Sequence, residues 1–253
     1  DIVNNRLVPN PMEPRATLGH YDSGEDHYTC WTTSQNPHVA RLVMSAFYNV
    51  APENKLRVIA PDVGGGFGSK IYIYPEEIVC LWASKKSGVP VKWVSDRTEA
   101  FLTDAHGRDH VTHVEMAFDK GNNIVGLKVD TIANLGAYMS LFSSATPTYL
   151  YATLLSGQYN IPAIHANVRT VYTNTAPVDA YRGAGRPEAT FVMERTMETA
   201  ARELGVSPTE LRRQNFVKSF PHQTPVIMCY DAGDFSASLD AAMKAADYAG
   251  FEK

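Results

Sequence analysis

A cluster of glycines in residues 64–68 constrains the fold of this chain more than any other segment. The run Gly64-Gly65-Gly66-Phe67-Gly68 follows Leu56 to Ala60, which is typical of a β-strand. Glycine loses more backbone entropy on ordering than any other residue, so such a cluster predicts left-handed backbone or very close approach of another group. A mobile turn is the alternative, because glycine is also common in turns.

The spacing excludes the two common nucleotide-binding loops. A P-loop reads G-x-x-x-x-G-K-[ST], but here Lys70 follows Ser69 and precedes Ile71. A dinucleotide fingerprint reads G-x-G-x-x-G, and the last position counted from Gly64 is Ser69. What remains is a row of backbone N–H groups that can donate to an oxygen-rich ligand, with Phe67 as the only bulky side chain.

Composition narrows the class of protein. With 253 residues, 44% of them hydrophobic and 20% charged, the chain can bury a substantial core. A net charge of -4 favours neither nucleic acid nor anionic membrane, and no membrane span or secretory signal is visible. Cys30, Cys80 and Cys229 fit neither a metal site nor a disulfide framework, so we expect buried thiols and a cytoplasmic location. Because the first residue is Asp1, we expect a processed chain or a piece of a longer one.

Gln35 lies in a turn before an expected helix. Residues 28–33 indicate a strand, Asn36 is a good N-cap, and Pro37 is a good first helical residue. Apolar residues then recur at helical spacing as far as Phe47. Most loop glutamines are simply exposed to solvent. Gln35 is therefore a candidate functional residue only if other segments indicate a binding site at the same position.

Periodicity and turn residues predict the remaining elements. We expect helices over 75–87 and from Pro187 to Leu204, a helix after a capping box at 207–210, and a last helix capped by Asp234. Strands are expected over 89–94, 110–118, 124–135 and 166–174, with a hairpin turn at 119–123 and a possible helix over 148–155. In the strand over 124–135, period two places these residues on one face: Val125, Leu127, Val129, Thr131, Ala133 and Leu135.

Three histidines, His106, His110 and His113, could be mistaken for a metal cluster. On one strand His110 and His113 point to opposite faces, so they cannot bind one ion together. We therefore predict no zinc site here.

A second glycine loop, Arg182-Gly183-Ala184-Gly185-Arg186, precedes the helix that Pro187 starts. Its backbone N–H groups and two guanidinium groups can converge on one anion. An arginine pair with a purely structural role is the alternative.

Three segments taken together carry a family resemblance. The chain resembles the molybdenum-binding large subunit of the xanthine oxidase and aerobic carbon monoxide dehydrogenase family, in a cysteine-less form. The likeness extends from residues 5–15 to residues 211–216 and rests on residues 33–37 (TSQNP), 64–70 (GGGFGSK) and 180–188 (AYRGAGRPE).

The resemblance implies an α+β fold, with mixed β-sheets covered by helices, and assigns residues 1–253 to the first molybdopterin-binding domain. It implies that a substrate-channel domain and a second cofactor domain, which carries the catalytic glutamate, lie outside the chain. The implied cofactor is molybdenum-molybdopterin, in the cytosine dinucleotide form, with no direct protein ligand to the metal. [2Fe-2S] clusters and FAD are implied on partner subunits. In the family a glutamate base activates a metal-bound hydroxyl, which hydroxylates an electrophilic carbon with oxygen from water.

Residue roles also follow from the resemblance. Gln35 would donate to a metal oxo group, and Arg182 would lie beside the metal or the pterin. The remaining cofactor-binding residues are backbone positions of the two loops, with Arg186 a weaker candidate: Gly65, Gly66, Phe67, Gly68, Gly183, Ala184 and Gly185.

Departures from the family pattern bear on the substrate. Purine-oxidising members have Glu, Arg and Phe where this chain has Ile71, Leu150 and Ala184. Carbon monoxide oxidisers have a copper-binding cysteine where this chain has Gly183. We therefore expect part of an aldehyde or aromatic heterocycle hydroxylase that has no turnover alone. The alternatives are carbon monoxide oxidation without that cysteine, and a non-catalytic binding or assembly domain.

Overall fold

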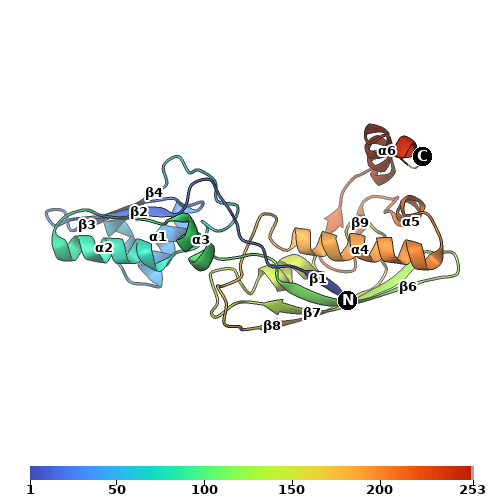
Figure 1. Cartoon of the computed structure of the whole chain (residues 1–253), viewed down its shortest axis with the longest axis horizontal. Coiled ribbons are helices and arrows are strands. Elements are labelled where there is room, and N and C mark those ends of the chain that lie inside the picture. The colour runs from blue at the N-terminus through green and yellow to red at the C-terminus, as the bar shows by residue number, and fades with distance from the viewer. Residues whose placement is uncertain (252–253) are drawn as a thin grey trace.

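The chain forms two lobes joined at a narrow waist (Figure 1). The computed structural model describes residues 1–251. The chain starts in one lobe with strand β1 (Ile2–Asn4), crosses to build the other lobe, and returns after helix α3 (Arg97–Thr103). Segments distant in sequence therefore meet at the waist.

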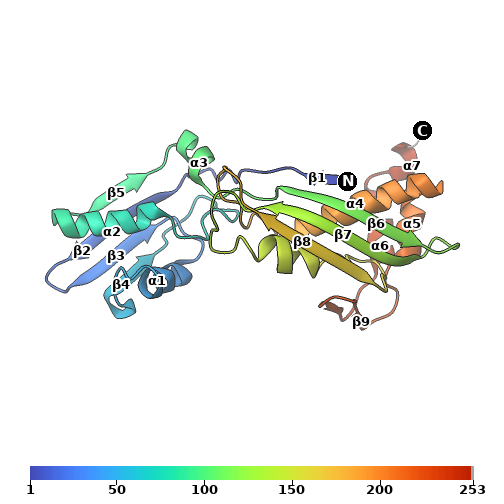
Figure 2. The same ribbon diagram turned by 90° about the horizontal axis from the view of Figure 1, so that it is seen from below.

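The first lobe contains a mixed four-stranded sheet in the order β4-β3-β2-β5, in which only β3 and β4 are parallel. Its strands are β2 (Ala16–Asp22), β3 (His27–Thr32), β4 (Leu56–Ile59) and β5 (Val91–Val94). Helices α1 (Pro37–Ala46) and α2 (Pro75–Ser87) cover one face (Figure 2). Packing is close: a Cβ at Gly19 would lie 2.5 Å from the carbonyl carbon of Cys80 on α2, which explains glycine in this strand.

The second lobe contains a mixed sheet in the order β1-β6-β7-β8, with β7 and β8 parallel. Its other strands are β6 (His110–Phe118), β7 (Ile124–Asn134) and β8 (Ile164–Val171). Helix α4 (Arg186–Leu204) lies along one face, followed by α5 (Pro208–Asn215), a short β9–β10 hairpin (His222–Gln223 and Cys229–Tyr230), α6 (Phe235–Ala245) and α7 (Tyr248–Phe251). The core lies between sheet and helix and includes Val129, Tyr151, Leu155, Met193 and Met197.

The predicted fold class, an α+β fold with mixed sheets covered by helices, is confirmed. Most helices and strands lie where the periodicity of apolar residues and the positions of proline and glycine predicted them. Helix α2 spans Pro75–Ser87 and ends at the left-handed Gly88, and Asp234 caps α6 by accepting from Ala237 N. His110 is buried and His113 exposed, as opposite faces of β6 require.

Several local predictions are wrong. Val125 is 45% exposed and Ile124 is buried instead, because the β6–β7 register shifts at Ala117 and Phe118. Ser207 makes no capping bond to the α5 backbone, and its hydroxyl pairs with Thr209 Oγ1.

Three further expectations need correction. Asn36 provides no side-chain cap for α1. The expected helix over 148–155 is a π-helical turn at Thr146–Leu150. Cys229 is exposed, whereas Cys30 and Cys80 are buried as expected.

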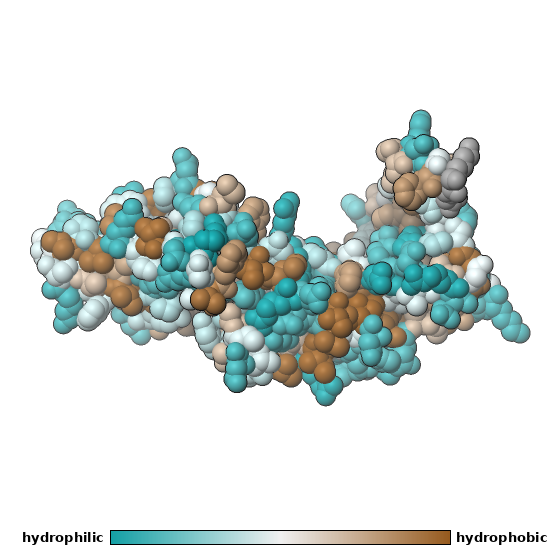
Figure 3. Space-filling view, in the orientation of Figure 1, coloured by the Kyte–Doolittle hydropathy of each residue, from teal (hydrophilic) through white to brown (hydrophobic). Residues whose placement is uncertain are grey.

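The surface seen in Figure 3 is mixed, with one hydrophobic patch near the N-terminal strand β1 and smaller ones over the first lobe. Val3 of that strand is 58% exposed. No helix in residues 1–251 combines the length and apolarity that crossing a membrane requires.

Burial of His110 makes stability depend on pH. Desolvation lowers its pKa from 6.5 to about 4, so the unfolded chain binds a proton more readily than the folded one. The stabilisation is complete above pH 6.5 and is lost as the pH falls towards 4. The variant His110→Phe keeps an aromatic contact with Tyr151 but cannot bind a proton. Between pH 7 and pH 4.5 we expect its free energy of unfolding to fall by about 2 kcal/mol less than that of the wild type.

Urea unfolding at several pH values measures this difference. The matched control is His113→Phe on the exposed face of the same strand, where solvent limits any effect. Parallel pH profiles for wild type and His110→Phe would contradict the prediction.

Candidate functional site

The three segments singled out in the sequence meet at the waist. Gln35 N donates to Lys70 O at 2.8 Å, which joins the glutamine turn to the first glycine loop. Arg182 N donates to Phe67 O at 2.9 Å, which joins the two glycine loops. The predicted convergence of these segments is therefore present in the fold.

The Gln35 side chain has a fixed orientation. Its Oε1 accepts from Gly68 N at 2.9 Å and from Lys70 N at 3.4 Å. Both partners are N–H donors, so the amide oxygen must face them. Gln35 Nε2 consequently points the other way and has no acceptor within residues 1–251. The turn thus presents a preorganised hydrogen-bond donor.

The glycines of the first loop are required by the chain's own packing. A Cβ at Gly66 would collide with the Gln35 amide, and a Cβ at Gly68 would collide with the carbonyl of Ala180. Gly65 and Gly68 have φ of 95° and 111°, and Phe67 between them has φ of 54°. Left-handed backbone is uncommon for a bulky residue and tends to occur where surrounding contacts enforce it. The Phe67 ring remains 43% exposed and its N–H has no acceptor in the described part of the chain.

The second loop also contains successive residues with left-handed backbone. Gly183, Ala184 and Gly185 have φ of 98°, 42° and 84°, and Ala184 N donates to Tyr181 O at 2.8 Å. This tight turn leads directly into α4, where unsatisfied N–H groups and the helix dipole favour anions. The Arg182 guanidinium carbon lies 5.8 Å from the centre of the Phe67 ring, so the two exposed side chains are neighbours. The Arg186 side chain makes no hydrogen bond or ion pair within residues 1–251.

A strap from the N-terminal segment holds the first loop. Lys70 is fully buried, and its Nζ donates to Glu13 O at 2.7 Å and to Glu13 Oε2 at 2.9 Å. The same carboxylate accepts from Gly64 N at 2.8 Å. Burial works to raise the pKa of Glu13, but the bonds from Lys70 and Gly64 outweigh it and leave that pKa lowered.

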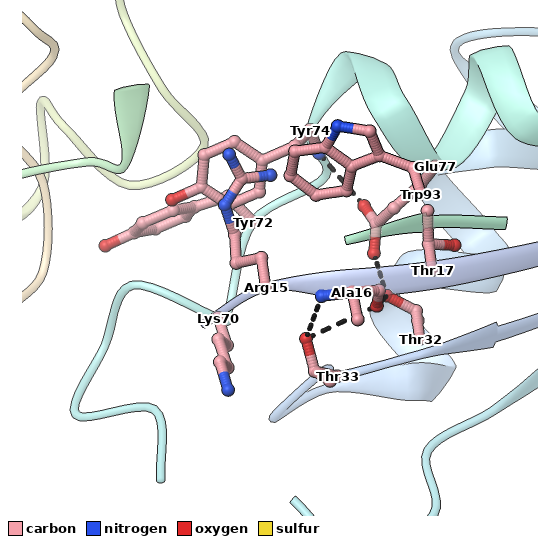
Figure 4. Close-up of a pocket in the computed structure, with 10 residues that line it drawn as sticks. All are labelled: Arg15, Ala16, Thr17, Thr32, Thr33, Lys70, Tyr72, Tyr74, Glu77 and Trp93. Carbon is pink, nitrogen blue, oxygen red and sulfur yellow. Dashed lines mark hydrogen bonds between the residues drawn. The ribbon is translucent and has the colours of Figure 1, made fainter. Parts of the chain in front are cut away.

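Behind the first loop, a small polar cavity lies among β2, β3 and α2 (Figure 4). Its volume of about 10 Å³ suits at most one water molecule. Arg15 lies here, 3.6 Å from the centre of the Tyr74 ring, and pairs with Asp104 at 2.6 Å. Burial raises the pKa of Glu77, which accepts from Thr32 Oγ1 at 2.6 Å. This cluster supports the loop and is too small to hold a cofactor.

Sequence reasoning missed the supports of the site. Glu13 and Lys70 appeared only as parts of motifs, and Arg108 carried no signal at all. Arg108 is 6% exposed and contacts the second loop from behind. Within residues 1–251, no group of three or more His, Cys, Asp or Glu side chains could hold a metal ion.

Replacing Gly68 by alanine tests the close approach of the loops. We expect Gly68→Ala to destabilise the protein by at least about 2 kcal/mol more than Gly88→Ala, since only Gly68 faces a carbonyl oxygen. Gly88 has φ of 73° but nothing within 4 Å of an added Cβ, so it controls for backbone strain. Urea unfolding measures both, and equal losses would show that the contact with Ala180 is not tight.

A family model and two relatives match most of this chain. Residues 1–216 match the family model of the molybdopterin cofactor-binding domain. The chain is 39% identical over 250 residues to the carbon monoxide dehydrogenase large chain of Hydrogenophaga pseudoflava, covering 96% of this chain and 31% of that protein. It is 35% identical over 248 residues to the nicotine 6-hydroxylase large subunit of Paenarthrobacter nicotinovorans, covering 97% of this chain and 30% of that protein.

Solved structures give the same result. Quinoline 2-oxidoreductase from Pseudomonas putida 86 superimposes with a TM-score of 0.93 and 30% identity, covering 99% of this chain and 32% of that chain. The chain thus spans less than a third of the length of each of these three relatives. The family predicted from the sequence is confirmed: this chain belongs to the molybdopterin cofactor-binding domain family.

Proposed function

We propose that this chain is the first molybdopterin-binding domain in the large subunit of a molybdenum hydroxylase. The whole enzyme would oxidise an aldehyde or an aromatic heterocycle, with water as the oxygen source. The observation that carries this proposal is the locked amide of Gln35 beside the two glycine loops. A donor held rigidly in advance is the device that stabilises a negatively charged oxygen most effectively.

The residues present fit an anionic, oxygen-rich cofactor. Within residues 1–251, Gln35 Nε2 and the N–H of Phe67 are donors without an acceptor, and the glycines around them leave no side chain in the way. Gly65, Gly66 and Gly68 would bring the backbone close to the cofactor. On the other loop, Arg182 would add positive charge, and Gly183, Ala184 and Gly185 would add backbone contacts. When bound, molybdenum-molybdopterin would supply the two-electron redox chemistry.

The side chains near the loops bear on the substrate class. Ile71, Leu150 and Ala184 offer none of the groups that purine oxidisers use. Gly183 has φ of 98°, and a Cβ there would lie 2.5 Å from Pro187 Cγ, so a copper-binding thiolate would require this turn to rearrange. These contacts disfavour purine and carbon monoxide chemistry. The named relatives that act on nicotine and quinoline support a heterocyclic substrate.

The rest of the enzyme is inferred from the family. We propose the cytosine dinucleotide form of the cofactor, and [2Fe-2S] and FAD on iron–sulfur and flavin subunits. The remaining domains of the large subunit would supply the catalytic glutamate and the substrate channel. Because the chain spans less than a third of the two large subunits named above, we expect no turnover from it alone. A non-catalytic binding or assembly domain is the rival function, and it would need the loops but not the Gln35 donor.

Gln35→Glu separates these functions. The carboxylate can still accept from Gly68 N and Lys70 N, but it has no N–H to donate. In the complete enzyme we expect about a 10²-fold loss in kcat, the typical cost of one lost donor, with molybdenum content retained. Mass spectrometry for molybdenum, nucleotide extraction and steady-state kinetics with an N-heterocycle provide the measurements.

The matched control is Asn54→Asp, the same amide-to-carboxylate change at an exposed side chain that makes no hydrogen bond within residues 1–251. It should change neither molybdenum content nor kcat. Wild-type protein that contains no molybdenum would refute the proposed function. Undiminished turnover of Gln35→Glu would refute the role of the amide.

A further inference from the structure

Arg108 lies behind the second loop and is almost completely buried. Its Nη1 donates to Tyr181 O at 2.9 Å, and its Nη2 donates to Arg182 O at 2.8 Å. Nη1 also donates to Glu188 Oε1 at 3.1 Å, and the guanidinium carbon is 4.7 Å from the centre of the Tyr181 ring. One planar cation therefore holds two successive carbonyl oxygens and the first turn of α4.

Because the peptide unit is planar, the two bonds from Arg108 to carbonyl oxygens also fix where the N–H groups of the same peptide units point. In a trans peptide the N–H points away from the C=O of the same unit. The carbonyls of Tyr181 and Arg182 face Arg108, so the N–H groups of Arg182 and Gly183 face away from it. Arg182 N meets Phe67 O at 2.9 Å, and Gly183 N has no acceptor within residues 1–251. The Gly183 N–H therefore points to the exposed side of the loop.

The backbone around Arg108 is itself in an unusual conformation. Arg108 and Asp109 have φ of 64° and 71°, which is rare for two successive residues other than glycine. Asp109 is held by Arg6 at 2.9 Å and accepts from Asn134 Nδ2 at 2.9 Å. Gly107 faces Tyr181 so closely that a Cβ would collide with it. Such backbone persists only where surrounding contacts enforce it, and here it directs the Arg108 side chain into the loop.

Glu188 completes the arrangement. It is fully buried on the first turn of α4, and its Oε2 has no hydrogen-bond partner within residues 1–251. A buried carboxylate in this place would oppose an anion at the helix start unless a cation stood beside it. Arg108 supplies that cation and makes the helix start compatible with a negatively charged ligand.

We propose that Arg108 is a positioning residue that sets the direction of two peptide units in the second loop. It turns the Gly183 N–H outward and keeps Arg182 bonded to the first loop. The significance of this direction for the molybdenum cofactor rests on the proposed function. The direction itself depends only on the contacts of this chain.

Arg108→Lys tests the proposal. Lysine has the same Cβ, so the strain at the left-handed position is unchanged, but an ammonium cannot reproduce the planar fork that holds two carbonyls. We expect hydrogen exchange in the peptide containing Arg182 and Gly183 to accelerate about tenfold, because the bond to Phe67 O weakens. Exchange in β7 should stay unchanged, which separates a local effect from general destabilisation. Arg169→Lys on β8, an exposed arginine, is the matched control.

Molybdenum content is measured on the same samples of the complete enzyme. We expect Arg108→Lys to lose at least half of the metal and Arg169→Lys to lose none. A wild type without molybdenum would refute the proposed function, while hydrogen exchange would still decide the role of Arg108.

Unchanged exchange at Arg182 and Gly183, or an equal increase across β7, would overturn the proposal. Undiminished molybdenum in Arg108→Lys would overturn its link to the cofactor. If Arg108→Lys fails to fold, the double variant Arg108→Gln/Glu188→Gln replaces it. It leaves no buried charge unpaired and removes the guanidinium fork from the two carbonyls, so we expect faster exchange in the same peptide, and no acceleration would again overturn the proposal.

Discussion

The hydrogen bond from Arg182 N to Phe67 O connects the two loops of the site. Each loop comes from a different lobe, and contacts within its own lobe fix its shape. Lys70 and Glu13 hold the first loop, and Arg108 and Glu188 hold the second. The bond from Arg182 N to Phe67 O, with the close packing of Gly68 on Ala180, can therefore align the donors of both lobes on one ligand.

Backbone groups, with few side chains, make up most of this site. Glycines at 66 and 68 allow the loops to pack on Gln35 and Ala180, and left-handed residues turn successive peptide units in different directions. Such backbone is unfavourable for Phe67 and Ala184, so the surrounding hydrogen bonds must offset its cost. In return, the donors are fixed before a ligand arrives, which reduces the ordering cost of binding.

Charged residues beneath the surface carry out the alignment. Arg15, Lys70 and Arg108 are all buried, and each has a carboxylate partner, Asp104, Glu13 or Glu188. Removing one partner of a buried pair leaves an uncompensated charge and is strongly destabilising. This cost is highest for Arg108 and Glu188, because both side chains are buried, whereas Glu13 is 36% exposed and Arg15 has a second partner in Glu76.

Local patterns in the sequence were sufficient for most elements, and the family resemblance supplied the fold class. Proline at the start, glycine at the end and the periodicity of apolar residues between them located α2 and α4, because these signals act within a few residues. The same reasoning failed at Val125 and Ser207, where a register shift and a competing hydroxyl overrode the local pattern. Gln35 and the two glycine loops were identified as candidates, but their motifs did not say what each atom does.

Tertiary structure alone decided those atomic roles. The bonds that orient Gln35 span up to 35 residues, and the pair of Arg108 with Glu188 spans 80 residues. No local spacing encodes such contacts, because they arise only when distant segments of one lobe fold together. The sequence by itself determined which segments could bind an oxygen-rich ligand. Contacts within each lobe decided which N–H groups face outward and why glycine is required at Gly66, and the contact between the lobes explains glycine at Gly68.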